Sequence, residues 1–236
     1  CKRGPFYDKI KRRNGGENML RIIVAMQNEA DELLSRAHVS EERTLYGKKI
    51  YAGNAFGKDF YLVLSGVGKT NAAASAMLAA AKLGADRLLN FGLAGGISAR
   101  TDIAAVFRVS RAVQYDFDLS EVNGTQKGTL NEYPGPYFPL ACANTVFPRA
   151  TLATGDKLTS SLADIPLFNE LGADVRDMEG AAIAHVAHFT GTPFSAYKAV
   201  SNKIGAESVT QYRQFTQRAL AALGENMEKI FGELDG

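Results

Sequence analysis

Cysteine is scarce in this chain, and its charges nearly cancel. The 236 residues include two cysteines, Cys1 and Cys142, and carry a formal net charge of +2. Two cysteines in a chain of this length form neither a disulfide framework nor the spaced thiols of a zinc site. The small net charge gives no reason to expect binding to nucleic acid or to an anionic membrane. We therefore expect a cytoplasmic protein without nucleic-acid or membrane partners.

Long apolar stretches are also missing. No run approaches the roughly 18 consecutive apolar residues that a transmembrane helix needs. The first 18 residues carry six basic side chains and lack the apolar core of a signal peptide. We expect residues 1–18 to be a basic N-terminal arm or a non-native remnant, with Met19 as the natural start. A lipidated Cys1 is the alternative. Residues 19–236 are expected to form one domain.

Apolar runs alternate with helical patterns from Met19 onward, and 46% of the chain is hydrophobic. Strands are predicted at Leu20–Met26, Lys48–Tyr51, Asp59–Ser65, Arg87–Gly92, Ala105–Val109, Thr151–Thr154, Ala173–Arg176 and Phe194–Ser201. Helices are predicted at Asn28–Ala37, Thr70–Leu83, Leu162–Leu171, Glu179–Thr190 and Glu207–Leu234. The glycines and prolines of Ser120–Cys142 predict a long loop. This alternation predicts an α/β protein with three α/β/α layers and a central mixed, twisted sheet.

Two glycine-rich segments each follow a predicted strand. Ser65–Thr70 resembles a P-loop, but position 63 is Val where that motif requires Gly, so binding of a nucleoside triphosphate is not expected. Gly92–Gly96 does not match the dinucleotide fingerprint either. Both segments can be plain turns, or they can bring backbone amides close to a ligand at the edge of the sheet.

Other polar pairs have simpler explanations. His185 and His188 stand three apart on a predicted helix, but no third ligand lies nearby in the sequence, so no metal and no other cofactor is expected. Asp116 and Asp118 alternate, as they would at the polar end of a strand that enters a loop.

The segment Asp177–His185 is the most informative in the chain. A strand ends in acidic residues and passes at once into a helix of small residues. Glu179 would lie in the first turn, where the helix dipole favours a carboxylate, and this alone would explain the residue. Glu29 also lies near a junction between a strand and a helix, so the two acids could converge on one site.

Taken together, these segments resemble the purine nucleoside phosphorylase superfamily and, within it, the methylthioadenosine/S-adenosylhomocysteine nucleosidases. The matching stretches follow the order of that family: Ala25–Glu29, Ser65–Lys69, Asn90–Gly96, Thr154–Asp156, Asp177–His185 and Ala199–Asn202. The resemblance extends from about Leu20 to the C-terminus and implies a nucleoside phosphorylase-like fold, a small-molecule purine nucleoside as ligand, and a homodimer.

The resemblance also implies roles for individual residues. Glu29 matches the general base that activates water, Glu179 matches the acid that holds the ribose 2′-hydroxyl, and Asn202 falls at the catalytic position beside the base. The expected substrate-binding residues are Val67, Leu93, Ala94, Gly95, Leu158, Thr159, Met178, Ser201 and Tyr212. Cleavage of a glycosidic bond through an oxocarbenium-like transition state suits such a pair of carboxylates.

Asn202 is the main departure from the nucleosidases, which carry Asp at this position. Asn has no proton to transfer to a departing purine, although its amide can both donate and accept hydrogen bonds. Ser201-Asn202 followed by Lys203-Ile204-Gly205 resembles the futalosine hydrolases, whose substrate carries hypoxanthine. The base therefore stays open between adenine and a 6-oxopurine.

Leu93 stands in the loop where phosphorylases of the superfamily bind phosphate, and a leucine accommodates an anion poorly, so we expect water to be the nucleophile. The sequence thus predicts a hydrolase that cleaves the N-glycosidic bond of a 5′-substituted purine nucleoside of the methylthioadenosine/S-adenosylhomocysteine type. The alternatives are a futalosine hydrolase or another enzyme acting on 6-oxopurine nucleosides, and a catalytically impaired nucleoside-binding protein.

Overall fold

The computed structural model describes residues 19–142, 144–158 and 161–235. The expected arm at residues 1–18 and the predicted site residue Thr159 lie outside these ranges.

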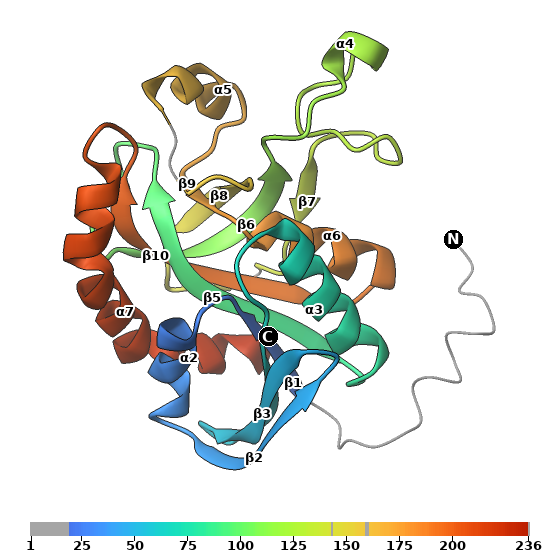
Figure 1. The fold of residues 1–236 in the computed structure, drawn as a ribbon, viewed down its shortest axis with the longest axis vertical. Helices are drawn as coiled ribbons and strands as arrows, with labels where there is room; N and C mark the ends of the chain where they lie inside the picture. Colours follow the sequence, from blue (N-terminus) through green and yellow to red (C-terminus); the bar gives the residue numbers. More distant parts are fainter. Residues whose placement is uncertain (1–18, 143, 159–160, 236) are drawn as a thin grey trace.

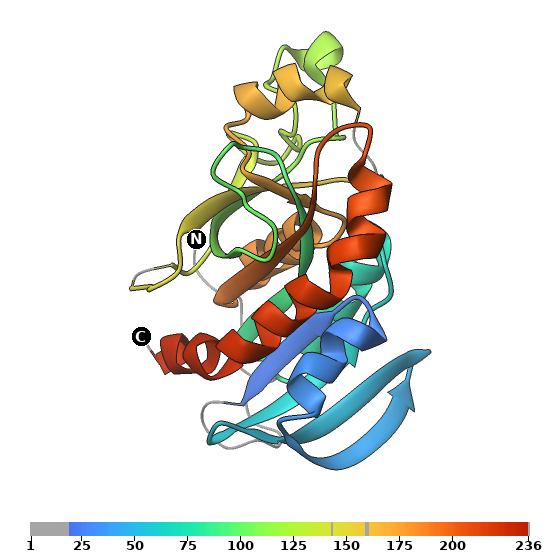
Figure 2. The same ribbon diagram turned by 90° about the vertical axis from the view of Figure 1, so that its left-hand side faces the viewer.

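Within the described residues, ten strands form one mixed sheet, in the order β10-β6-β8-β9-β5-β1-β4-β3-β2, with β7 paired to β6. The strands are β1 (Leu20–Val24), β2 (His38–Leu45), β3 (Lys48–Ala55), β4 (Lys58–Leu64), β5 (Arg87–Gly96), β6 (Val106–Gln114), β7 (Tyr137–Pro139), β8 (Arg149–Thr154), β9 (Val175–Asp177) and β10 (Phe194–Lys203). The β2–β3 hairpin and the segment around α4 and α5 lie at opposite ends of the molecule (Figures 1 and 2).

Strand β5 is where the sheet closes on itself. Its first residues pair with β1, nearly its whole length pairs with β10, and Gly95 and Gly96 at its end pair with β9. Because β10 also pairs with β6, and β8 joins β6 to β9, these strands form a closed ring. The ring places the ends of β5, β9 and β10 side by side.

Helices cover both faces of the sheet (Figure 1). They are α2 (Gln27–Leu34), α3 (Lys69–Ala81), α4 (Ser120–Asn123), α5 (Ile165–Glu170), α6 (Gly180–Thr190) and α7 (Ser208–Gly232), with short 3-10 helices at Leu162–Asp164 and Glu233–Asp235. The buried alanines of α3 and α6 share one core cluster, whereas Leu33 of α2 and Leu223 of α7 share another. The predicted three-layer α/β fold with a mixed central sheet is therefore confirmed.

Local composition explains most of these elements. All five residues of β1 are buried, as a central strand with covered faces requires. The sequence of α3 is rich in alanine, the residue with the highest helix propensity, and alanine also lets α3 lie close to the sheet. Helix α6 ends at Thr190, and the following Gly191 adopts φ of +66° as a left-handed C-cap.

Two predictions of local structure were wrong. The predicted helix Asn28–Ala37 ends at Leu34, and the unpredicted strand β2 begins at His38. Seven of the eight residues of β2 are exposed, so the strand has no apolar alternation by which a sequence could reveal it. The predicted loop Ser120–Cys142 contains helix α4 and strand β7.

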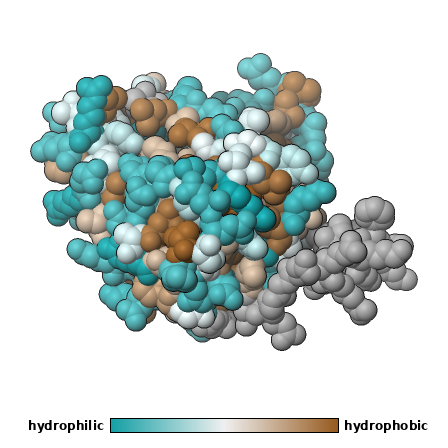
Figure 3. Space-filling model, turned by 60° about the horizontal axis from the view of Figure 1, so that its bottom comes forward, coloured by the Kyte–Doolittle hydropathy of each residue, from teal (hydrophilic) through white to brown (hydrophobic). Residues whose placement is uncertain are grey.

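Hydrophilic side chains predominate on the face shown in Figure 3, and hydrophobic ones form separate patches among them. Such patches are normal for a folded protein. Within the described residues, every helix is too short or too polar to traverse a bilayer.

We predict that Leu223→Ala lowers the free energy of unfolding by about 2–5 kcal/mol, the usual cost of truncating a fully buried leucine. Leu223 is 0% exposed between α7 and the sheet. Urea denaturation measures the change, and the exposed neighbour Glu225→Ala is the control, for which little change is expected. Equal stability of the Leu223 and Glu225 variants would contradict the assigned packing.

Candidate active site

Buried polar side chains gather where β1, β5, β9 and β10 end. Glu29, Asp177, Glu179, Lys198 and Asn202 are each at most 7% exposed. Charged residues are seldom buried to this extent unless they are paired or hydrogen-bonded. Their convergence from distant parts of the chain therefore marks the candidate active site.

Glu29 lies in the first turn of α2, directly after β1. Its carboxylate accepts hydrogen bonds from the backbone N–H of Met26, at 3.1 Å, and of Leu93, at 2.8 Å. A Cβ atom on Gly92 would lie 2.5 Å from Glu29 Oε1, so the carboxylate needs a glycine at this position of β5. Strand β5 thus both binds the carboxylate and leaves room for it.

Glu179 is the N-cap residue of α6. The predicted helix began at Glu179, whereas α6 begins one position later, at Gly180. Its Oε1 accepts a hydrogen bond from the backbone N–H of Gly68 at 2.9 Å, in the turn after β4. Gly68 has φ of +99°, a conformation that suits glycine and turns its N–H toward the carboxylate. The two predicted acids, Glu29 and Glu179, are therefore both held by backbone amides at the same edge of the sheet.

Asp177 and Lys198 form a buried ion pair between β9 and β10, with 2.8 Å between Oδ2 and Nζ. Asp177 also accepts hydrogen bonds from Thr154 Oγ1 at 2.5 Å and from the Gly180 N–H at 2.8 Å. These bonds satisfy the carboxylate, so it supports the start of α6 and positions Lys198 among the acids.

The charges of the cluster shift one another. Burial raises the pKa of Glu29, an effect that Lys198 and two backbone hydrogen bonds oppose. Burial, followed by the charge of Asp177, raises the pKa of Glu179 to about 7. Burial disfavours the charged form of Lys198, but Asp177, Glu179 and Glu29 outweigh it and raise its pKa. Glu29 and Glu179 therefore take up a proton at a higher pH than an exposed glutamate does, and they lie beside a lysine that stays charged.

Asn202 lies at the other end of the cluster. Its Oδ1 accepts a hydrogen bond from Ser201 Oγ at 2.9 Å, and its Nδ2 donates to Ser208 Oγ at 2.7 Å. Arg176 Nη2 donates to the same Ser208 oxygen at 3.3 Å. The amide of Asn202 is thus held in place by side chains of β10 and α7, and Arg176 of β9 bonds the same serine.

The remaining predicted contacts lie around these groups. Leu93, Ala94 and Gly95 are buried on β5, and the Ala94 carbonyl accepts a hydrogen bond from Ser201 Oγ at 3.4 Å. Met178 is half-buried between Asp177 and Glu179.

Three predicted residues with large side chains lie nearer the surface. Val67, in the turn whose Gly68 binds Glu179, is 45% exposed, and Leu158 is 55% exposed. Tyr212 is half-buried on α7 with its hydroxyl 4.0 Å from Met26 Sδ, and burial, followed by the charge of Glu29, raises its pKa.

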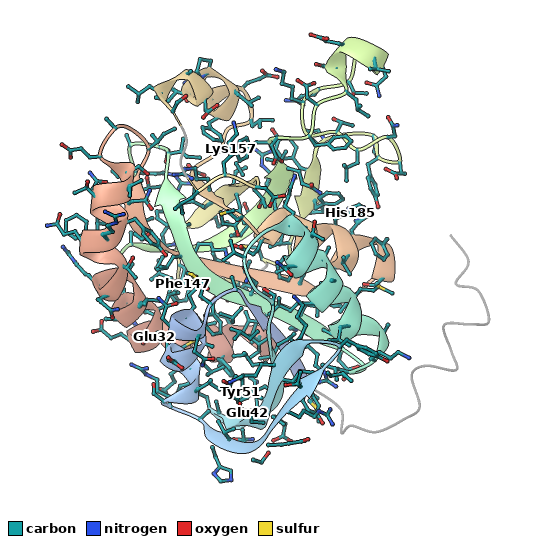
Figure 4. All side chains as sticks on the ribbon, in the orientation of Figure 1. Glu32, Glu42, Tyr51, Phe147, Lys157 and His185 are labelled. Carbon is teal, nitrogen blue, oxygen red and sulfur yellow. The ribbon has the colours of Figure 1, made fainter. Side chains whose placement is uncertain are left out.

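Other sequence motifs lie outside the cluster. His185 on α6 contacts Tyr133 and Phe138, and Figure 4 shows it apart from Lys157 and the loop after β8. Asp116 lies just past β6 and pairs with Lys69. In the described part of the chain, no group of three or more His, Cys, Asp or Glu residues could hold a metal ion.

Sequence reasoning missed Lys198, Arg176 and Ser208. Lys198 could have been noticed, because it interrupts the apolar residues of Ala196–Val200, and a charge in a buried strand needs a partner. Arg176 offered the same signal between Val175 and Asp177. Ser208 offered none, since serine at the start of a helix is ordinary.

Comparisons with known proteins show the family to which the chain belongs. Residues 20–231 match the family model of the phosphorylase superfamily. The chain belongs to this superfamily. Among curated members, it is 29% identical to the 5′-methylthioadenosine/S-adenosylhomocysteine nucleosidase of Halalkalibacterium halodurans, over 90% of this chain and 97% of that protein. The corresponding protein of Anoxybacillus flavithermus is 27% identical, over 91% of this chain and 98% of that protein.

Solved structures of the superfamily share the fold. The 5′-methylthioadenosine/S-adenosylhomocysteine nucleosidase of Helicobacter pylori superimposes with a TM-score of 0.86 at 21% identity, over 93% of this chain and all of that chain. The futalosine hydrolase of the same species gives a TM-score of 0.85 at 22% identity, over 92% of this chain and 98% of that chain. The resemblance indicated by the sequence motifs is thereby confirmed.

We predict that Gly92→Ala lowers the free energy of unfolding by about 1–3 kcal/mol, because the added methyl group overlaps Glu29 Oε1 in a packed site. Chemical denaturation measures the change. Gly135→Ala is the control, since a Cβ atom there meets nothing within 4 Å. A Gly92 variant as stable as the control would show that the Glu29 carboxylate moves away without cost.

We predict that Glu179→Gln gains stability relative to the wild type as the pH rises. The folded protein holds the Glu179 proton up to a pKa of about 7, above the ordinary value of 4.5, so ionisation across this window costs the wild type stability. Glutamine does not ionise. Melting temperatures measured from about pH 5 to about pH 8 should show a difference that grows with pH. A difference that is constant or shrinks would contradict the raised pKa.

Proposed function

We propose that this protein is a hydrolase that cleaves the N-glycosidic bond of a 5′-substituted purine nucleoside and releases the free base. The observation that carries the proposal is the pair of buried carboxylates, Glu29 and Glu179, each held by a backbone amide at one edge of the sheet. The relatives named above as 5′-methylthioadenosine/S-adenosylhomocysteine nucleosidases support it and make those two compounds the first substrates to test.

Glu179 holds the ribose in this proposal. As the bond to the base breaks, positive charge develops on the sugar ring, and a nearby carboxylate stabilises that charge. A carboxylate also accepts a hydrogen bond from a ribose hydroxyl. Met178 packs beside the sugar, while the exposed apolar side chains of Val67 and Leu158 are available to the 5′ substituent and the base. Tyr212 and the β5 residues Leu93, Ala94 and Gly95 complete the proposed binding surface.

Glu29 activates the water molecule. A general base works best when its pKa lies near the working pH, and burial moves the pKa of Glu29 upward in that direction. Lys198 keeps Glu29 and Glu179 from becoming fully protonated, because its charge opposes the raised pKa of both. The lysine thus lets two buried carboxylates function in one small site.

Water suits this site better than phosphate. Three carboxylates, those of Glu29, Asp177 and Glu179, surround the single ammonium group of Lys198, which already pairs with Asp177. An incoming phosphate would meet an excess of negative charge, whereas water would not. The Leu93 N–H, which could bind an anion, already donates to Glu29.

Two alternatives follow from Asn202, which has no proton to give to the leaving base. In the first, the substrate is a 6-oxopurine nucleoside, such as the futalosine named for one structural relative. In the second, the chain binds a nucleoside without cleaving it. Since general acid catalysis contributes roughly 10²–10⁴ in rate, its loss would slow an enzyme without abolishing its activity.

We further propose that residues 19–236 act as one domain, and that the protein is a homodimer of the cytoplasm. The exposed apolar side chains of Met77, Val122 and Phe189 are candidates for a subunit contact. Analytical ultracentrifugation, with Phe189→Glu as the variant, tests the dimer.

The proposed activity is tested by incubating the protein with methylthioadenosine, S-adenosylhomocysteine, futalosine and inosine, each with and without phosphate. Chromatography follows the free base. Release of base without phosphate is the expected result. A requirement for phosphate would refute hydrolysis, and ligand binding without release would favour the binding protein.

We predict that Glu29→Gln lowers kcat by roughly 10²–10⁴ while binding of the nucleoside changes little, because only the proton-accepting group is lost. Steady-state rates and calorimetric titration measure the two quantities. Glu32→Gln is the matched control, since Glu32 lies on the same helix (Figure 4) and pairs with Arg36. If Glu29→Gln keeps the wild-type rate, Glu29 is not the base.

A further inference from the structure

Arg176 is a buried cation that the proposed reaction leaves without a role. It lies on β9 between Val175 and Asp177 and is 4% exposed. Burial lowers its pKa, yet an arginine side chain stays protonated in proteins. Placing such a charge in the interior is costly unless it is compensated. A cation in this position therefore calls for a partner.

The pairing of the strands places Arg176 on the same face of the sheet as Asn202. Arg176 pairs with Gly95 between β9 and β5, and Gly95 pairs with Asn202 between β5 and β10, so the three residues lie in register across neighbouring strands. Residues paired in this way project from the same face of a sheet. A Cβ atom on Gly95 would lie 3.1 Å from Arg176 Nε and 3.2 Å from its Cζ. The guanidinium group thus lies across the bare backbone of Gly95.

The hydrogen bonds of Arg176 leave one N–H of its guanidinium group without an acceptor. Nη1 donates to the Leu158 carbonyl at 2.7 Å, and Nη2 donates to Ser208 Oγ at 3.3 Å. Nε is buried and has no partner. Among the described residues, no carboxylate forms an ion pair with the guanidinium group, and the groups that act on it electrostatically are Tyr115 and Asp164. The group therefore lacks a further acceptor for Nε.

Ser208 joins Arg176 to Asn202 through hydrogen bonds, and these bonds also leave mainly donors unused. Its oxygen accepts hydrogen bonds from both Asn202 Nδ2 and Arg176 Nη2, which fills its two lone pairs and leaves its own hydrogen to be donated. Asn202 Oδ1 already accepts from Ser201. The acceptor oxygens of Asn202 and Ser208 are thus already hydrogen-bonded within the protein. The groups that remain available to a ligand are mainly N–H and O–H donors.

We propose that Arg176 is a specificity-determining residue that makes the base subsite select a 6-oxopurine over a 6-aminopurine. The inference rests on the proposed function, which places the purine beside Asn202. Along this edge a 6-oxopurine presents the acceptor O6 beside N7, and a guanidinium group is a strong donor to O6. The amino group of adenine instead brings hydrogens toward a group that is already rich in donors.

The same cation compensates for the missing acid. When the C1′–N9 bond breaks, its electron pair goes to the base, and negative charge spreads over the purine ring and O6. A guanidinium group near O6 stabilises that charge without transferring a proton. Asn202 then needs only to hold N7 by hydrogen bonding, which its amide can do.

The test uses two substrates that differ only at position 6 of the base, 5′-methylthioinosine and 5′-methylthioadenosine. The ratio of their kcat/KM values is measured for the wild type, Arg176→Met and Arg176→Lys. Arg111→Met is the matched control, because Arg111 lies on β6 against the ring of Tyr137, and the same charge is removed there. A general loss of stability would lower both rates and leave the ratio unchanged.

We expect the wild type to prefer methylthioinosine. Arg176→Met should shift the ratio toward methylthioadenosine by roughly 10- to 100-fold, Arg176→Lys by less, and Arg111→Met not at all. A wild type that prefers methylthioadenosine, or a ratio that Arg176→Met leaves unchanged, would overturn the proposal while the nucleosidase activity stands.

If the wild type cleaves neither of these two substrates, calorimetric titration with free hypoxanthine and free adenine decides the specificity separately from the proposed function. Preferential binding of hypoxanthine that Arg176→Met abolishes would support the role of Arg176. Equal binding of the two bases, or preferential binding of adenine, would refute it.

Discussion

The ion pair between Lys198 and Asp177 is the interaction on which the rest of the site depends. Three carboxylates lie buried within range of one another, and in a medium of low polarity their charges repel one another strongly. The ammonium group of Lys198, 2.8 Å from Asp177, is the cation that opposes this repulsion. Removing one partner of such a buried ion pair usually lowers the free energy of unfolding by far more than the intact pair raises it.

Glycines determine where these side chains can lie. Gly92 leaves the space that the Glu29 carboxylate fills, and Gly95 leaves the space over which Arg176 passes. At Gly180, a Cβ atom would lie 2.3 Å from Leu152 Cδ2 and 3.0 Å from Asp177 Oδ2. In each case, the absence of a side chain on one element allows a charged group of another element to sit against the backbone and its amides.

The closed part of the sheet divides the site into two chemically distinct halves. Glu29, Asp177, Glu179 and Lys198 form an acidic half that suits a sugar developing positive charge. Arg176, Asn202, Ser201 and Ser208 form the other half, which carries donors and one positive charge. When the bond between the sugar and the base breaks, the positive charge on the sugar and the negative charge on the base would each be stabilised by the half of the site that it faces.

The sequence by itself determined the α/β alternation, the junctions between strands and helices, and the segments that contain Glu29, Glu179 and Asn202. These features are local, because apolar periodicity and turn residues act over a few neighbouring positions. Only the tertiary structure decided that β2 is a strand, that β5 joins β1, β9 and β10, and that Lys198 and Arg176 belong to the site. Strand pairing links residues far apart in the chain, and a buried charge finds its partner only when those strands meet, so no local pattern encodes either one.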